Sequence, residues 1–195
     1  MSMIRAKRFT KLRKELEYWN SELKYIQEVL KEWHHEFERF QRKYCEDNNI
    51  DLNRLNRENS EKVNEIMSKA VTSKKVKVDF KKKNYNKQIK KIYKELAKIL
   101  HPDVGGNESE FKKVTSAMSS NNLQQILDIC DEHNIQIEID DELFNFLKSE
   151  ISEVKKQIEK EKSTYSWKLY NCDENDKCKN NLMKQFLKHF FNYRR

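Results

Sequence analysis

The strongest helix-breaking residues of this chain all lie in one segment of six residues, 101–106 (His-Pro-Asp-Val-Gly-Gly). Pro102, Gly105 and Gly106 are the only proline and the only glycines among 195 residues. Proline ends a helix and restricts the residue before it, whereas glycine adopts positive φ angles without strain. The sequence therefore predicts a molecule of long helices with one sharply defined corner, and we look for function first at that corner.

A heptad pattern predicts the first helix. Large apolar residues alternate at spacings of three and four, which is typical of a coiled coil. Further apolar residues from Ile50 to Ala70 predict a second helix, folding back on the first as a coiled-coil helical hairpin over 1–72. Because the seam is rich in Trp and Phe, an intramolecular hairpin and a homodimer both remain open. The seam residues are Phe9, Leu12, Leu16, Trp19, Leu23, Ile26, Leu30, Trp33, Phe37, Phe40 and Tyr44.

Two short amphipathic helices are predicted on either side of the corner. A lysine-rich linker at 73–86 precedes the first of them, which runs from Lys87 to Leu100. Asn107 is expected to cap the second, and helices joined by so short a connection should pack antiparallel. The rest of the chain, 122–195, predicts a C-terminal helical region that ends in a hairpin with its break at 171–176. The predicted fold class is thus all-α.

Composition narrows the environment of the protein. Charged residues make up 37% of the chain and hydrophobic residues 36%, which suits amphipathic helices that bury only one face. No apolar run approaches the roughly 20 residues of a membrane span. The four cysteines, Cys45, Cys130, Cys172 and Cys178, match no common zinc or redox spacing. We therefore expect free thiols, a reducing compartment and a cytoplasmic protein, with a viral or organellar origin left open.

No pattern in the sequence points to catalysis. The chain has no Walker loop, no dinucleotide fingerprint and no nucleophile paired with a base. His34 and His35 lack a third metal ligand, and the carboxylates at 140–142 suit a helix N-terminus. We expect no enzyme activity, no cofactor and no metal. The C-terminal aromatic residues are expected to pack on the N-terminal helix, with client binding as the alternative; they are Trp167, Tyr170, Phe186, Phe190, Phe191 and Tyr193.

The residues around the corner resemble the second and third helices of the J domain, the module of the DnaJ co-chaperone family. The pattern Ile-x-x-x-Tyr-x-x-Leu-Ala ends at Ala97, His-Pro-Asp follows at 101–103, and Phe-x-x-Val-x-x-Ala runs from Phe111 to Ala117. The resemblance covers 87–118, and the domain would occupy 87–121. The chain lacks the family's first-helix signature, Tyr-x-x-Leu-Gly, and the second helix of the N-terminal hairpin is a candidate to replace that helix. It also lacks the fourth-helix signature, the Gly/Phe-rich segment and the Cys-x-x-Cys repeats.

The resemblance implies a specialised co-chaperone that docks on a DnaK-type heat-shock ATPase and stimulates its ATP hydrolysis. It implies that His101, Pro102 and Asp103 face the chaperone, with Asp103 paired to an arginine near the interdomain linker. The lysine face of the preceding helix would dock on an acidic surface; its residues are Lys87, Lys90, Lys91, Lys94 and Lys98. The flanking helices would select a client protein or a location.

A second interpretation follows from charge alone. The net charge is +8, and lysines are concentrated between Ser73 and Lys98. Such a stretch attracts phosphate groups as well as acidic protein surfaces. The alternative function is therefore a basic helical scaffold that binds nucleic acid or has a structural role, with the J-like fold as architecture only.

Overall fold

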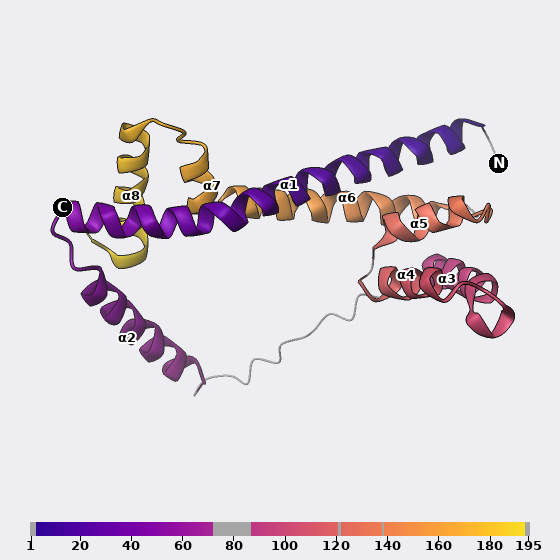
Figure 1. The fold of residues 1–195 in the computed structure, drawn as a ribbon, viewed down its shortest axis with the longest axis horizontal. Helices are drawn as coiled ribbons and strands as arrows, with labels where there is room; N and C mark the ends of the chain where they lie inside the picture. The colour runs from indigo at the N-terminus through magenta and orange to yellow at the C-terminus, as the bar shows by residue number, and fades with distance from the viewer. Residues whose placement is uncertain (1–2, 72–86, 121, 138, 194–195) are drawn as a thin grey trace. The chain divides into compact units, whose positions relative to one another are not determined.

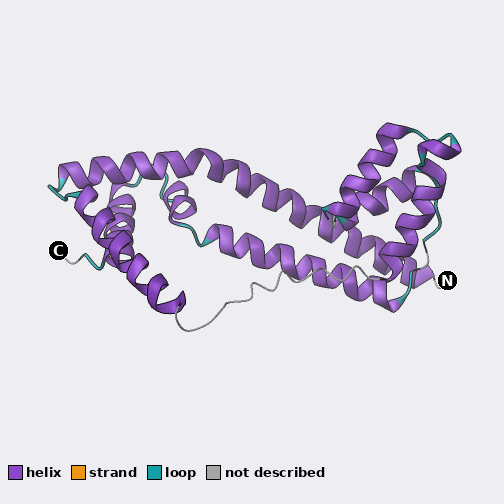
Figure 2. Ribbon diagram, turned by 90° about the horizontal axis from the view of Figure 1, so that it is seen from below, coloured by secondary structure: helices purple, strands orange, loops and turns teal. Residues whose placement is uncertain are grey.

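The structure is a computed structural model that describes residues 3–71, 87–120, 122–137 and 139–193. These residues form eight α-helices and one short 3-10 helix, with no β-strand among them (Figures 1 and 2). The predicted all-α class is confirmed. The predicted lysine-rich linker at 73–86 lies outside the described residues. Among the helices that are described, none is long and apolar enough to cross a lipid bilayer.

The helices group into two compact units, and neither unit is one continuous stretch of chain. Unit 1 takes the chain up to Glu22 and from Lys81 to Lys156, and unit 2 takes the rest. The helices in chain order are α1 (Met3–Asp47), α2 (Leu52–Val71), α3 (Lys87–Leu100), η1 (Pro102–Val104), α4 (Glu108–Ser119), α5 (Leu123–Glu132), α6 (Asp141–Lys162), α7 (Tyr165–Tyr170) and α8 (Asp176–Phe191). α1 and α6 each contribute residues to both units.

In unit 1, the beginnings of α1 and α6 run parallel. Arg5 Nη2 donates to Asp141 Oδ1 at 2.8 Å, the ring centroids of Phe9 and Phe144 lie 5.8 Å apart, and Lys155 Nζ donates to Glu15 at 2.9 Å. The sequence separation between the two partners is similar in all three pairs. This is expected when two helices run in the same direction. Lys155 holds the pKa of Glu15 below its usual range, chiefly through this hydrogen bond.

The core of unit 1 forms where these two segments meet α3, α4 and α5. Leu96 of α3, Val114 of α4, Leu127 of α5 and Leu143 of α6 are all 0% exposed. Each occupies the apolar face of an amphipathic helix, so hydrophobic burial is what holds the α3–α4 pair on the rest of the unit.

Six of the eleven predicted seam residues of α1 are buried within the chain, and the other five are half-buried. Phe9, Leu16, Ile26, Leu30, Phe37 and Tyr44 are at most 9% exposed. In unit 2 the partners are the C-terminal aromatic side chains, as expected. The ring centroid of Phe37 lies 5.0 Å from that of Phe186 and 6.1 Å from that of Tyr165, and Trp33 lies 5.4 Å from Tyr170.

The predicted hairpin between α1 and α2 is not confirmed. α2 packs against α8, where Leu55 is buried. The apolar residues further along α2 are not covered, since Val63, Ile66 and Met67 are 44%, 67% and 64% exposed. The physical reason is that the aromatic side chains of α7 and α8 already cover the seam of α1 in this unit.

Two predictions about the C-terminal region are corrected. The long helix ends at Lys162 rather than at 171–176, because Thr164 starts a new helix by accepting the N–H of Trp167 at 3.3 Å. The expectation of four free thiols is also wrong. Cys172 and Cys178 form a disulfide, because the turn between α7 and α8 brings their Cα atoms to 5.5 Å.

The other two cysteines, Cys45 and Cys130, are free thiols and buried. Burial is the main cause that raises the pKa of Cys130 to about 11, so this thiol stays protonated and unreactive near neutral pH. Because Cys172 and Cys178 form a disulfide, the cysteines no longer support the inference of a reducing compartment.

Candidate functional site

The helix α3 separates an apolar face from a basic one, as the sequence predicts. Ile92, Leu96 and Leu100 recur at every fourth position and are at most 6% exposed. Opposite them Lys90, Lys91, Lys94 and Lys98 are exposed, and Lys98 Nζ lies 2.9 Å from Glu95 Oε1. Lys87 begins the helix, but its side chain lies outside the described residues. The predicted basic face is therefore present from Lys90 onward.

The corner begins where α3 ends. His101 leaves the helix with φ −65° and ψ 133°, as the residue before a proline must, and its Nδ1 accepts the backbone N–H of Asp103 at 3.2 Å. Pro102 then starts the 3-10 turn η1, and Gly105 closes it at φ 84° by donating its N–H to the Pro102 carbonyl at 3.0 Å. The histidine ring thus caps the turn that carries the aspartate.

The two glycines have different tasks. Gly105 supplies the positive φ, with open space around its missing side chain. Gly106 supplies room, because a Cβ there would lie 2.3 Å from the carbonyl carbon of Leu100. The chain therefore crosses directly over the last residue of α3, and only a glycine fits at the crossing.

We expect Gly106→Ala to destabilise unit 1 by about 2–3 kcal/mol, at the upper end of the cost of overpacking, because the backbone of Leu100 cannot yield as a side chain can. Gly105→Ala is the matched control and should cost about 1–2 kcal/mol for its left-handed conformation alone. Urea unfolding followed by circular dichroism measures both. Equal costs would contradict the tight crossing at Gly106.

The three residues of the corner differ in how far they are exposed to solvent. The ring of His101 packs edge-on against Phe111, with centroids 4.8 Å apart, and this side chain is 41% exposed. Pro102 is exposed, and the side chain of Asp103 is 85% exposed. Asp103 Oδ2 lies 3.4 Å from His101 Nδ1, the same nitrogen that accepts the Asp103 N–H. Because the Asp103 side chain is so exposed, its carboxylate oxygens are accessible to another molecule.

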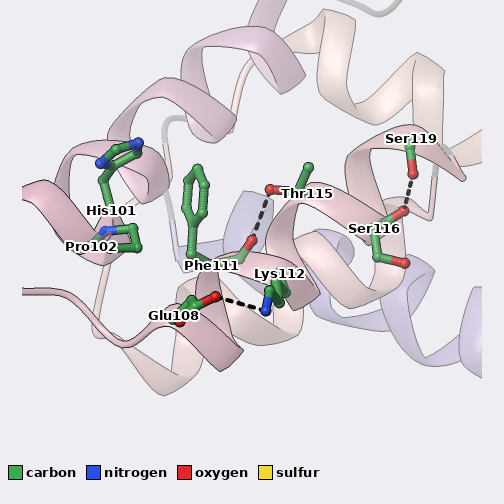
Figure 3. Close-up of a pocket in the computed structure, with 8 residues that line it drawn as sticks. All are labelled: His101, Pro102, Glu108, Phe111, Lys112, Thr115, Ser116 and Ser119. Carbon is green, nitrogen blue, oxygen red and sulfur yellow. Dashed lines mark hydrogen bonds and ion pairs between the residues drawn. The ribbon is translucent and has the colours of Figure 1, made fainter.

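A shallow groove runs from the corner along α4 (Figure 3). Asn107 caps α4 as predicted, with its Oδ1 accepting the N–H of Ser109 at 2.9 Å. Lys112 pairs with Glu108 at 2.7 Å along one edge of the groove, and Phe111 and Thr115 follow its length. This groove was not predicted from the sequence. The signal was the apolar and hydroxyl residues at spacings of four, Phe111, Thr115 and Ser119.

The α3–α4 pair is supported by elements that the sequence did not single out. α5 packs against both helices. α1 is tied to α5 by Arg13, whose guanidinium lies 2.9 Å from Asp128 and 2.7 Å from Asp131. The second predicted helix was a candidate for this supporting place, but α2 belongs to unit 2. There it packs against α8, where Leu55 is buried.

One member of the histidine pair on α1 has a role in packing. His34 Nδ1 lies 2.7 Å from Ser166 Oγ, so His34 forms a hydrogen bond to α7 within unit 2. Comparisons with protein-family models, with curated proteins and with solved structures find no match to this chain.

Proposed function

We propose that this protein is a co-chaperone that docks on a DnaK-type heat-shock ATPase through the 101–103 corner and stimulates ATP hydrolysis by that ATPase. The observation that supports it most is the presentation of Asp103. Its carboxylate is 85% exposed at the tip of a turn that a proline, a histidine cap and a tightly packed glycine hold in place. A carboxylate forms strong charge-assisted bonds to a guanidinium, and here it is available for one on another molecule.

The basic face of α3 supports the same proposal. Lys90, Lys91, Lys94 and Lys98 lie on the helix that leads into the corner, on the side away from the core of unit 1. An acidic partner surface would be steered to this face, so that Asp103 arrives close to its arginine. Docking would then favour the conformation of the chaperone that is competent for hydrolysis, and the protein itself performs no chemistry.

The proposal is tested by single-turnover ATP hydrolysis. DnaK and its cytosolic and organellar eukaryotic counterparts are each loaded with ATP and mixed with increasing amounts of the full chain. We expect saturable stimulation of at least one chaperone. Absence of stimulation across the whole panel would overturn the proposal. Salt-sensitive binding to duplex DNA of any sequence, in that case, would favour the nucleic-acid scaffold suggested by charge alone.

The charge of α3 gives a separate prediction. Lys91→Glu together with Lys94→Glu should slow association with the chaperone about tenfold at low salt, with a smaller defect at high salt, because steering is screened by ions. Stopped-flow mixing at several salt concentrations measures this. The matched control is Lys11→Glu with Lys14→Glu, an exposed pair with the same spacing and the same change of charge on α1. An equal defect in both double variants would show that only net charge matters.

A further inference from the structure

Two exposed aliphatic side chains flank the corner. Ile99 is 50% exposed and Val104 is 64% exposed, one on each side of the sequence 101–103. In the described residues of unit 1, the other exposed large hydrophobic side chains, Met3, Ile4 and Tyr18, are all on α1. Within the α3–α4 pair and the corner that joins them, the exposed large hydrophobic side chains are therefore those just before and just after residues 101–103.

The position of Ile99 is not required by the packing of α3. A helix turns about 100° per residue, which puts Ile99 at the border between the buried face and the lysine face. The exposed positions of α3 from residue 90 onward are otherwise all charged: Lys90, Lys91, Lys94, Glu95 and Lys98. Ile99 is not among the residues that pack on the core of unit 1, so the fold does not require an isoleucine at this position.

Val104 is equally unexplained by the turn. Its role in η1 is played by its backbone, whose N–H donates to the His101 carbonyl at 3.0 Å. Any residue with an N–H can make this bond, and β-branched residues have no advantage at an exposed turn position. The stability of the corner therefore does not explain why this residue is a valine.

From these positions we infer that Ile99 and Val104 are specificity-determining residues, which contact an apolar patch on the chaperone beside the arginine that receives Asp103. This inference rests on the proposed function. The docking surface then has three parts of different chemistry: a basic face, a carboxylate, and an apolar rim formed by Ile99 and Val104, which flank 101–103 in the sequence. Only a DnaK-type chaperone with a matching apolar patch would be accepted, because charged or polar groups opposite the rim would be buried without partners.

Adding positive charge at these two positions distinguishes an apolar contact from docking that depends on charge alone. Ile99→Lys and Val104→Lys add positive charge next to a face that docks on an acidic surface. If docking depended on charge alone, the double variant would bind at least as well as the unmodified protein. If the apolar rim makes contact, the same variant must bury an ammonium group and bind less well.

The experiment measures half-saturation of ATPase stimulation with the chaperone that responds best in the panel. We expect the double lysine variant to need about ten times more protein for half-saturation, with full stimulation restored at saturation. Ile99→Thr with Val104→Thr, which adds no charge, should give a smaller loss. Ile4→Lys is the matched control, an exposed aliphatic residue of α1 in the same unit, and should change nothing. Circular dichroism confirms that each variant is folded.

The possible failures are distinguishable through Asp103→Asn. If this variant loses stimulation but the double lysine variant saturates at the same or a lower concentration than the unmodified chain, the apolar rim is refuted and the proposed function stands. If Asp103→Asn stimulates as well as the unmodified chain, Asp103 is not part of the docking surface and the inference fails with it. If no chaperone of the panel is stimulated by the unmodified chain, the proposed function itself fails.

Discussion

Replacing Asp103 by asparagine is expected to abolish stimulation of the chaperone's ATPase. Asparagine keeps the shape of the side chain but removes the negative charge, and with it the charge-assisted pair to a guanidinium. The structure also predicts that the fold is unaffected. The hydrogen bond from the Asp103 backbone N–H to His101 is retained by asparagine, and the carboxylate, which lies 3.4 Å from the same His101 nitrogen, is 85% exposed.

Two measurements on the same protein samples test this expectation. Single-turnover hydrolysis should fall to the rate of the chaperone alone, while the free energy of unfolding in urea should change by no more than about 0.5 kcal/mol. Asp47→Asn makes the identical substitution at an exposed position of α1 in unit 2 and should retain full stimulation. A variant that stimulates normally would remove Asp103 from the docking surface. A variant that unfolds would show that the carboxylate serves the turn instead.

The second large effect is expected for Phe37→Ala. Phe37 is 8% exposed and its ring packs against Tyr165 and Phe186. Removing a buried aromatic side chain of this size should destabilise the protein by about 3–5 kcal/mol, through lost burial and the cavity that remains. The two ring pairs add about 0.5–1.5 kcal/mol each beyond burial and favour the upper part of that range.

Urea unfolding of the full chain measures the loss, with Tyr18→Ala as the control on the same helix. Tyr18 is 60% exposed, so its replacement should change the free energy of unfolding by about 0.5 kcal/mol or less. Phe37→Leu should recover part of the stability because it refills part of the cavity. A loss below about 1 kcal/mol for Phe37→Ala would contradict the burial of the seam against α7 and α8.

The sequence alone was sufficient for features that depend on neighbouring residues. The bounds of α3, the stop at His101, the cap at Asn107 and the burial of one face of α1 were all predicted. Each follows from local sterics or from the period of the apolar pattern. A proline restricts φ wherever it stands, and a heptad shows which face of a helix avoids water.

The partner of each apolar face was decided only by the tertiary structure. The heptad of α1 was compatible with α2, with a second copy of the chain, and with the C-terminal aromatic residues, because hydrophobic attraction is non-directional. The structure pairs α1 with α6 in parallel and with the rings of Tyr165 and Phe186, and leaves Ile66 of α2 exposed. The shapes and sizes of the side chains, which a hydrophobic pattern does not record, select among such partners.

The same distinction applies to the candidate site. The His-Pro-Asp corner was visible in the sequence because its proline and glycines dictate the backbone. The need for space at Gly106 and the packing of His101 on Phe111 depend on how separate segments approach one another. Where the chain turns and which helix faces are apolar can therefore be predicted from the order of the residues. What each face packs against follows from the folded arrangement, because it depends on the fit between side chains from separate elements.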